Sequence, residues 1–406
     1  MPCRLDSAAP PATAAPAAAL PEALAWIEAD LDGLRAEGLE RPARVREGRQ
    51  AGAVRLDGRT LQNFGSNDYL GYAGDVRLTK AASKAACAEG FGAGASPLVS
   101  GHSLAHAALE RALAGLLGVE ATLVFPSGYA ANTATIAALA GPEDFIASDE
   151  RNHASIIDGC RLSRARLGVY PHRDLAALDA LLAAARPARR RLVVTDTLFS
   201  MDGTIAPLEG LCELAHKHAA MLMVDEAHAT GVFGGRGSGL VEETGTAAGV
   251  HVRIGTLSKA LGAAGGFVAG TATFIHWLRH RARAWMFSTA HPPGVAAAAT
   301  RAIALVAAEP ERRFELLARA VDFAASLRHR GLDVGDAEAQ IVPVMVGAPA
   351  TAVALSERLA DEGFFVPAIR PPSVPHGRSL VRASLSWLHD QRDLGRLATA
   401  LATHAR

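Results

Sequence analysis

The chain has 406 residues, and its 41 basic and 41 acidic side chains give a formal net charge of zero. A neutral chain has no long-range attraction for nucleic acid or an anionic membrane, so any anion must be bound by local groups. Half of the residues are hydrophobic, which at this length suffices for one large core or for a large domain with a smaller one.

The first twenty residues are rich in alanine and proline. A secretory signal needs an unbroken apolar stretch after a basic start, and prolines and Asp6 interrupt this one, so we expect residues 1–20 to form a disordered tail. No apolar run reaches the length of a membrane span. The four cysteines have no paired spacing, which argues against a disulfide framework or a zinc ribbon and favours a reducing cytoplasm.

The next segment predicts a helix and a hairpin. Apolar residues recur at three- and four-residue steps from Leu24 onward, which predicts a helix over about residues 21–46. The Asp57-Gly58 turn predicts a short hairpin over residues 55–64. We therefore treat residues 21–62 as an amino-terminal helix and hairpin segment.

A long alternation of short apolar runs and helix-length segments follows in residues 63–293. The predicted strands are ATLVF, DFIAS, RLGVY, RLVVTD, MLMVD and VRIGTL. Strand and helix repeated in this way predict an α/β fold with a mostly parallel central sheet covered by helices on both faces. Such sheets bind ligands beyond the carboxyl ends of their strands.

Near Pro292-Pro293 this alternation ends, and long alanine-rich segments that predict helices follow. Two more strand-like runs, IVPVMV and SLVRASLS, follow in the last part of the chain. We expect a smaller α+β carboxy-terminal domain over residues 294–406.

The run MLMVDEAHATG is a buried strand that ends in Asp225, with His228 on the following loop. An acid at this position is costly unless a partner pairs with it. One interpretation is an aspartate that caps the next turn; the other is a counter-ion for a protonated ring nitrogen. Two unit charges about 3 Å apart attract by roughly 5 kcal/mol at an effective dielectric of about 20 before desolvation, which would keep a pyridine nitrogen protonated at neutral pH.

Lys259, in GTLSKALGAAGG, lies 34 residues after Asp225 (259 − 225). One strand–helix–strand unit has about that length, so the two residues can reach the same crevice. A lysine there can form an imine with a carbonyl ligand, and burial would lower its pKa and ease that reaction. The alternative is a lysine that caps a helix end.

The run LVFPSGYAANTATIAALA predicts a strand, a short turn and a helix. Backbone N–H groups at a helix start, approached closely because Gly128 has no side chain, make an anion site. Thr256 and Ser258 flank the lysine segment and could add hydroxyl donors to the same phosphate. The histidine pairs His102/His106 and His216/His218 lack accompanying carboxylates or cysteines, so we expect no metal site.

An imine lysine, a ring-nitrogen aspartate and a helix-start phosphate site together describe a pyridoxal 5′-phosphate (PLP) enzyme. The chain resembles the α-oxoamine synthases, fold-type I enzymes that join an amino acid to an acyl thioester with loss of carbon dioxide. The resemblance runs from about Asn63 to the carboxy terminus. Its motifs are NFGSNDYLGY, GAGASPLVSGHSLAHAALE, PSGYAAN, NHASIIDG, TDTLFSMDG, VDEAHATGVFG, GTLSKALG and AIRPPSVPHGRSLVRASLS.

The resemblance implies roles for residues around the cofactor. Lys259 would be the Schiff-base lysine and Asp225 the partner of the ring nitrogen. His153 would stack on the ring, and His228 and Ser200 would lie by the ring hydroxyl. The groups implied for the phosphate are Gly128, Tyr129, Thr256 and Ser258.

It also implies how substrate and partner are bound. Arg382, with Asn67, would bind the substrate carboxylate, for which a planar guanidinium is suited. Family members are homodimers with shared active sites, so Ser373 would reach the partner's phosphate. The far end of the acyl group has three candidate binding residues, namely Arg41, Arg44 and Arg46.

The motif AIRPPSVPHG resembles the version in members that condense L-alanine with pimeloyl-CoA or a pimeloyl carrier protein in biotin biosynthesis. Members that use glycine, namely 2-amino-3-ketobutyrate ligase and 5-aminolevulinate synthase, usually lack the arginine before the double proline and are the alternative. A non-catalytic partner subunit is less favoured, because such subunits lack the lysine that Lys259 supplies.

Overall fold

The computed structural model describes residues 21–405, and the chain divides into two compact units at Ala43–Arg44. The tail expected over residues 1–20 lies outside the described residues. The domain boundaries expected at 62/63 and 293/294 fall inside the second unit and stay predictions.

The first unit contains the 3₁₀ turn η1 (Glu22–Leu24) and helix α1 (Trp26–Ala36). The helix predicted over residues 21–46 is therefore too long. Gly38 adopts φ 67° and its N–H donates to the Arg35 carbonyl at 3.0 Å. A glycine in the left-handed region is a common helix terminator because it lacks a Cβ that would clash there.

The second unit opens with the predicted hairpin. Strand β2 (Ala53–Leu56) pairs antiparallel with β3 (Arg59–Asn63), and both turn residues have positive φ, 48° at Asp57 and 77° at Gly58. That conformation matches the twist of a tight hairpin. Two further strands complete the sheet in the order β1-β2-β3-β12. They are β1 (Arg46–Glu47) and β12 (Phe364–Phe365).

The central sheet has seven strands in the order β4-β10-β9-β8-β7-β5-β6. The six predicted strands all form: β4 (Ala121–Phe125), β5 (Phe145–Asp149), β6 (Arg166–Tyr170), β7 (Arg191–Asp196), β8 (Met221–Asp225) and β9 (Val252–Thr256). The seventh strand, β10 (Gly266–Gly270), is antiparallel to both of its neighbours. Its terminal glycines, which weaken the pattern of a strand, explain why the sequence did not predict it. The mostly parallel sheet is confirmed.

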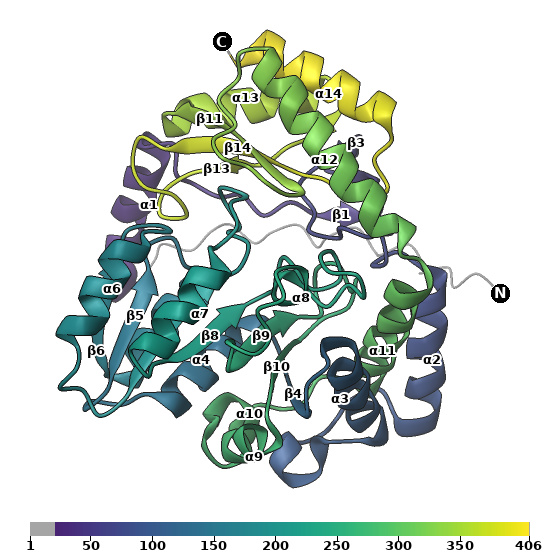
Figure 1. The fold of residues 1–406 in the computed structure, drawn as a ribbon. Coiled ribbons are helices and arrows are strands. Elements are labelled where there is room, and N and C mark those ends of the chain that lie inside the picture. The colour runs from purple at the N-terminus through teal and green to yellow at the C-terminus, as the bar shows by residue number, and fades with distance from the viewer. Residues whose placement is uncertain (1–20, 406) are drawn as a thin grey trace. The chain divides into compact units, whose positions relative to one another are not determined.

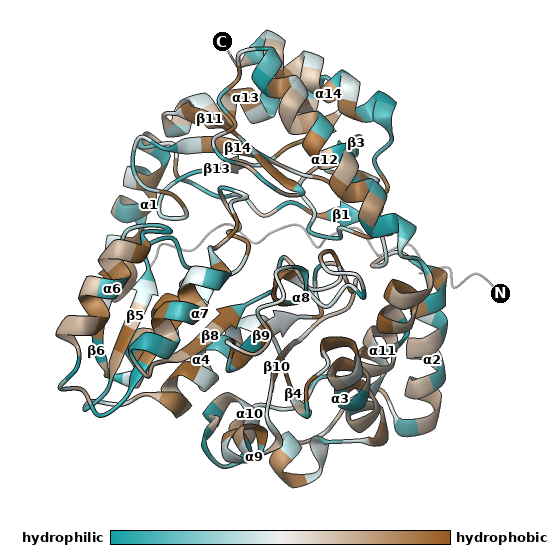
Figure 2. Ribbon diagram, viewed as in Figure 1, coloured by the Kyte–Doolittle hydropathy of each residue, from teal (hydrophilic) through white to brown (hydrophobic). Residues whose placement is uncertain are grey.

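Helices cover both faces of this sheet. Neighbouring residues of each strand point to opposite faces, so their side chains pack in two different clusters. Met223 packs in one apolar cluster, and Leu222 and Val224 pack in the other. The first cluster includes residues of α4 (Gly128–Leu139), α5 (Ala154–Ser163), α9 (Ala272–Arg281) and α10 (Arg283–Phe287). The second includes residues of α3 (Leu104–Leu117), α6 (Leu175–Ala184), α7 (Leu208–Lys217) and α8 (Leu240–Glu243). Figure 2 shows hydrophobic and hydrophilic residues on different sides of α7.

Helix α11 (Pro293–Ala308) packs against α2 (Val76–Glu89) and α3, so segments from distant parts of the sequence lie side by side (Figure 1). The π-helical turn η2 (Pro97–Gly101) lies between α2 and α3 in the chain. Within residues 21–405, no helix combines the length and apolarity that a membrane span requires.

The last part of the chain forms a separate antiparallel sheet in the order β11-β14-β13. Its strands are β11 (Ile341–Gly347), β13 (Ala368–Ile369) and β14 (Ser379–Ser384), which confirms the two predicted strand runs. The accompanying helices are α12 (Glu311–His329), α13 (Pro349–Asp361) and α14 (Gln391–His404). In Figure 1, α13 and α14 are at the top of the view, and α12 runs down to the right of the strands. Arg382 in β14 pairs in register with Pro343 of β11.

Candidate active site

The site lies beyond the carboxyl ends of the parallel strands, where the sequence predicts a ligand. Strands β7, β8 and β9 end in Asp196, Asp225 and Thr256, and Asp196 lies opposite Asp225 in the sheet register. The loops that follow β8 and β9 carry His228 and Lys259. Residues separated widely in the chain thus meet at one edge because parallel strands present the same end there.

Asp225 is held by neutral hydrogen-bond donors. It points to the same face of the sheet as Met223, the side covered by α4, and its Oδ2 accepts from the Asn132 side-chain amide at 2.6 Å. Its Oδ1 accepts from the Ala227 N–H at 2.8 Å. Glu226 points the other way and accepts from Arg253 Nε at 2.7 Å. Within residues 21–405 no cationic side chain forms an ion pair with Asp225, which leaves its negative charge to a cationic group of a ligand.

Lys259 Nζ lies 2.8 Å from His228 Nε2. Burial lowers the pKa of Lys259 to about 8, although the negative charges of Asp225 and Asp196 oppose that change. Burial, and then the positive charge of Lys259, hold the pKa of His228 well below its usual range. The imidazole is therefore neutral, and part of the Lys259 population is a free amine near neutral pH, the form that attacks a carbonyl.

His153 caps the start of α5. Its Nδ1 lies 2.7 Å from the Ser155 hydroxyl, and its backbone N–H donates to Asp196 Oδ2 at 2.8 Å. Desolvation lowers the pKa of His153, whereas the charge of Asp225 raises it and that of Lys259 lowers it. The ring thus lies within electrostatic reach of both residues, as a side chain flanking a shared ligand should.

The start of α4 meets the end of β9 closely enough to form an anion cradle. Ser127 caps the helix by accepting from the Ala130 N–H at 3.0 Å. A methyl group on Gly128 would lie 3.5 Å from Thr256 Cβ, and Thr256 Oγ1 lies 2.7 Å from Ser258 Oγ. A methyl group on Gly266 would lie 2.5 Å from the Gly128 nitrogen. The first-turn amides of α4, which have no partner inside the helix, therefore lie beside the hydroxyls of Thr256 and Ser258, the first of which donates to the Gly265 carbonyl at 2.9 Å. Amides and hydroxyls grouped in this way fit a phosphate.

Arg382 comes from β14, a strand of the separate carboxy-terminal sheet. It is 7% exposed, and its Nη1 donates to the Ser200 carbonyl at 2.8 Å while its Nη2 donates to Asn67 Oδ1 at 3.4 Å. Its Nε is buried without a partner. In the described part of the chain no carboxylate pairs with this guanidinium, so it can bind the carboxylate of a substrate.

Three of the residues that the sequence predicts for the site are exposed or contact the site only through their backbone. The Tyr129 side chain is 45% exposed, and its hydroxyl donates to Asp158. Ser373 is exposed, and its N–H donates to the Arg370 carbonyl at 3.0 Å. Ser200 contacts Arg382 through its backbone carbonyl. Among residues 21–405, the side chains of Tyr129 and Ser373 bond to no other predicted site residue.

Sequence reasoning assigned no role to Asp196, Asn132 or Tyr69. Burial raises the pKa of Asp196 well above its usual range, and the negative charge of Asp225 raises it further. A signal existed for two of them: Asp196 ends an apolar strand as Asp225 does, and Asn132 is a polar residue in an apolar helix. For Tyr69 the sequence carries no such signal, because buried tyrosines are common in cores.

The chain matches the aminotransferase class I and II family over residues 59–401 and belongs to it, among the α-oxoamine synthases. Its relatives include the 8-amino-7-oxononanoate synthase of Anaeromyxobacter dehalogenans (strain 2CP-1), 50% identical over 94% of this chain and 95% of that protein. The 8-amino-7-oxononanoate synthase of Geobacter sulfurreducens is 47% identical over 93% of this chain and 97% of that protein.

Solved structures share the fold. Serine palmitoyltransferase from Sphingomonas wittichii is 33% identical, with a TM-score of 0.89 over 96% of this chain and 98% of that one. The S. paucimobilis enzyme, solved with a bound PLP–myriocin aldimine, is 30% identical with the same TM-score over 95% and 98%. The 8-amino-7-oxononanoate synthase of Francisella tularensis, at 24% identity and a TM-score of 0.74 over 84% and 97%, supports the fold alone.

Proposed function

We propose that the chain catalyses the PLP-dependent condensation of L-alanine with a pimeloyl thioester, giving 8-amino-7-oxononanoate, carbon dioxide and a free thiol, a step of biotin biosynthesis. The observation that carries this proposal is identity near 50% over 94% of the chain to relatives of that one name. The solved serine palmitoyltransferases are more distant, at 30–33% identity.

The residues of the site fit PLP. Lys259 would bind the aldehyde carbon, Asp225 the ring nitrogen, and the amides of Gly128 and Tyr129 the phosphate together with the hydroxyls of Thr256 and Ser258. His153 would cover the ring, and His228 and Ser200 would lie by its hydroxyl. When bound, PLP supplies an electron-withdrawing ring that stabilises negative charge on the α-carbon of the amino acid.

Lys259 is the group that moves protons at this carbon. Its pKa of about 8 suits a group that must accept a proton and later return it, because general acid–base catalysis works best near the ambient pH. The Cα–H bond of alanine breaks, a carbon–carbon bond forms to the acyl carbonyl, and the thiolate leaves. The bond to the carboxylate then breaks, and a proton from Lys259 replaces it at Cα.

Arg382 and Asn67 would hold the alanine carboxylate until it leaves as carbon dioxide. The guanidinium is fixed by the Ser200 carbonyl at 2.8 Å, so it is oriented before the substrate arrives. A preoriented binding group lowers the entropy cost of reaching the reactive geometry.

We further propose that the chain acts as a cytoplasmic homodimer with shared sites. Large apolar side chains are exposed around η2: Phe91, Leu98, Val99 and Leu104, at 84%, 51%, 78% and 80%. Such a patch favours burial against a second chain, and Ser373 would then reach the partner's phosphate. Light scattering should give about twice the chain mass; a monomer at micromolar concentration would contradict the dimer.

Product analysis tests the reaction. Purified protein loaded with PLP should convert alanine and pimeloyl-CoA to 8-amino-7-oxononanoate with release of carbon dioxide, and Lys259→Ala protein should not. Parallel reactions contain glycine with acetyl-CoA or succinyl-CoA, and a pimeloyl carrier protein in place of pimeloyl-CoA. If the reactions with glycine give a product and those with alanine do not, the proposal is contradicted and the chain is a glycine-using synthase. Colourless protein that takes up no PLP would instead indicate a non-catalytic subunit.

A further inference from the structure

Tyr69 is a fully buried tyrosine on the loop that follows the amino-terminal hairpin. Its hydroxyl lies 2.6 Å from His228 Nδ1 and 3.3 Å from Asn67 Oδ1. Within residues 21–405 this hydroxyl is the one hydrogen-bond partner of Nδ1. The other ring nitrogen of His228 faces Lys259 Nζ at 2.8 Å.

These contacts form an unbroken hydrogen-bonded path. It runs from the Lys259 amine through both nitrogens of His228 to the Tyr69 hydroxyl and the Asn67 oxygen. The same oxygen accepts from Arg382 Nη2 at 3.4 Å. The path therefore connects the group that moves protons with the group that binds the substrate carboxylate.

A neutral imidazole carries one proton, on either nitrogen. When Lys259 is an ammonium, it donates to Nε2, so Nδ1 carries the proton and donates to the Tyr69 oxygen while Tyr69 donates to Asn67. When Lys259 is a free amine, its lone pair can accept from Nε2–H, and Nδ1 then accepts from Tyr69. The Tyr69 hydroxyl serves both states because a hydroxyl can donate or accept. In either protonation state of Lys259, both ring nitrogens of His228 therefore have a hydrogen-bond partner.

We propose that Tyr69 is a positioning residue that acts through His228, switching between hydrogen-bond acceptor and donor as Lys259 loses and regains its proton. This role rests on the proposed function of Lys259. The other titratable or charged groups facing the pair are Asp225, Asp196, His153 and Arg382, and within the described chain none of them bonds to Nδ1.

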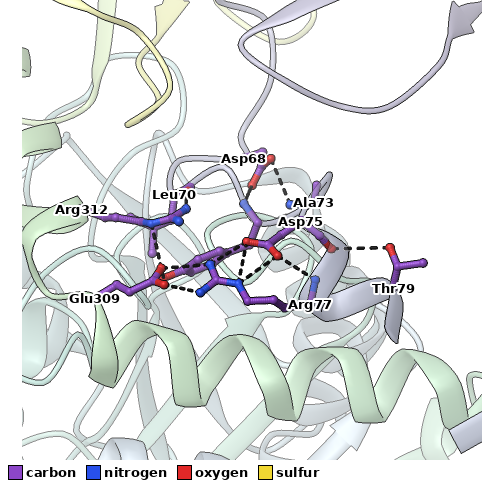
Figure 3. A network of polar contacts seen from close by, with 9 residues as sticks. Asp68, Leu70, Ala73, Asp75, Arg77, Thr79, Glu309 and Arg312 are labelled. Atoms are coloured by element: carbon purple, nitrogen blue, oxygen red, sulfur yellow. Dashed lines mark hydrogen bonds and ion pairs between the residues drawn. The ribbon is translucent and has the colours of Figure 1, made fainter. Parts of the chain in front are cut away.

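A polar network holds the backbone of the loop that contains Tyr69 (Figure 3). Asp68 accepts from the N–H groups of Tyr72 and Ala73 at 2.9 and 3.1 Å, and Arg312 donates to the Leu70 carbonyl at 2.7 Å. The same network includes Asp75, Arg77 and Glu309. The backbone on both sides of Tyr69, the residue whose hydroxyl lies beside His228, is therefore held by bonds within the chain.

The matched test compares Tyr69→Phe with Tyr72→Phe. Both tyrosines are fully buried, but the Tyr72 hydroxyl bonds Glu309 at 3.2 Å in the network and not the site. Nitrogen-15 NMR of cofactor-free protein reports which ring nitrogen of His228 carries the proton, with His228→Asn protein to assign the signals. Wild-type and Tyr72→Phe protein should change tautomer as pH rises through the Lys259 titration, and Tyr69→Phe protein should not.

The kinetic readout uses the PLP-loaded enzyme. Tyr69→Phe should lower kcat by about tenfold or more with the KM for alanine changed less than about twofold, within the range of a disturbed acid–base step. The proposal would be overturned if Tyr69→Phe protein changed tautomer with pH as wild-type protein does, or if the substitution altered KM and left kcat unchanged. Because the NMR measurement needs neither PLP nor substrate, it separates this failure from failure of the proposed reaction.

A second variant covers the case in which Tyr69→Phe does not fold. Incorporation of 3,5-difluorotyrosine at position 69 keeps the ring and the hydroxyl and makes the hydroxyl a stronger donor. It should stabilise the state in which Nδ1 accepts and move the tautomer change to lower pH. No movement, or movement to higher pH, would overturn the role of Tyr69.

Discussion

The altered pKa of Lys259 is the feature most directly open to measurement. Burial lowers it from 10.5 to about 8, which corresponds to about 3 kcal/mol. At pH about 7.5 roughly a quarter of the molecules then carry the free amine, against about one in a thousand for an ordinary lysine. The negative charge of Asp225 opposes the effect of burial, so we predict that Asp225→Asn lowers this pKa further, by roughly 1–3 units.

The substitution suits the local geometry. Asp225 accepts from the Asn132 amide at 2.6 Å, and Asn132 Oδ1 is buried without a partner. If the Asn132 amide turns over, that oxygen can accept from the new asparagine. Asp158→Asn is the control, since Asp158 bonds Tyr129 and is not among the charges that act on Lys259.

Competitive acetylation of cofactor-free protein measures this pKa. Limiting acetic anhydride is applied from about pH 6 to about pH 11, a range that spans both values, and peptide mass spectrometry follows Lys259 against the exposed Lys80. We expect a midpoint near 8 for wild-type and Asp158→Asn protein and a lower one for Asp225→Asn. A wild-type midpoint above about 10, or a rise in Asp225→Asn, would refute the reasoning.

Three further predictions concern binding and stability. Arg382→Lys should raise the KM for alanine about tenfold or more, since an ammonium cannot make the planar two-point contact; an unchanged KM in steady-state assays would contradict carboxylate binding. Gly266→Ala should weaken PLP uptake in absorbance titrations, because its methyl group would lie 2.5 Å from the Gly128 nitrogen, whereas Gly115→Ala, with open space around it, should not. Arg253→Met should lower the free energy of unfolding by roughly 3–5 kcal/mol in urea, because it leaves the Glu226 carboxylate buried and unpaired; a loss below about 1 kcal/mol would speak against that pair.

Local pattern was informative wherever one short segment decides the outcome. Five of the six predicted strands are buried along almost their whole length, and they were predictable because strands buried on both faces must be continuously apolar. The sixth, β6, is a largely exposed edge strand. The hairpin at Asp57-Gly58 was predictable because those residues tolerate positive φ. The helix over residues 21–46 was predicted too long, since the apolar spacing alone gave no weight to Gly38, where the backbone turns left-handed.

The sequence by itself determined the kinds of chemistry available: a lysine in a small-residue segment, an acid at a strand end, and a glycine before a helix, in an order that matches a family. Only the tertiary structure decided which groups touch. The bonds from Asn132 to Asp225 and from Tyr69 to His228 join residues 93 and 159 positions apart. Hydrogen bonds act over about 3 Å, and the distance between two side chains so far apart in the chain is fixed by how strands, loops and helices pack together, which no local pattern records.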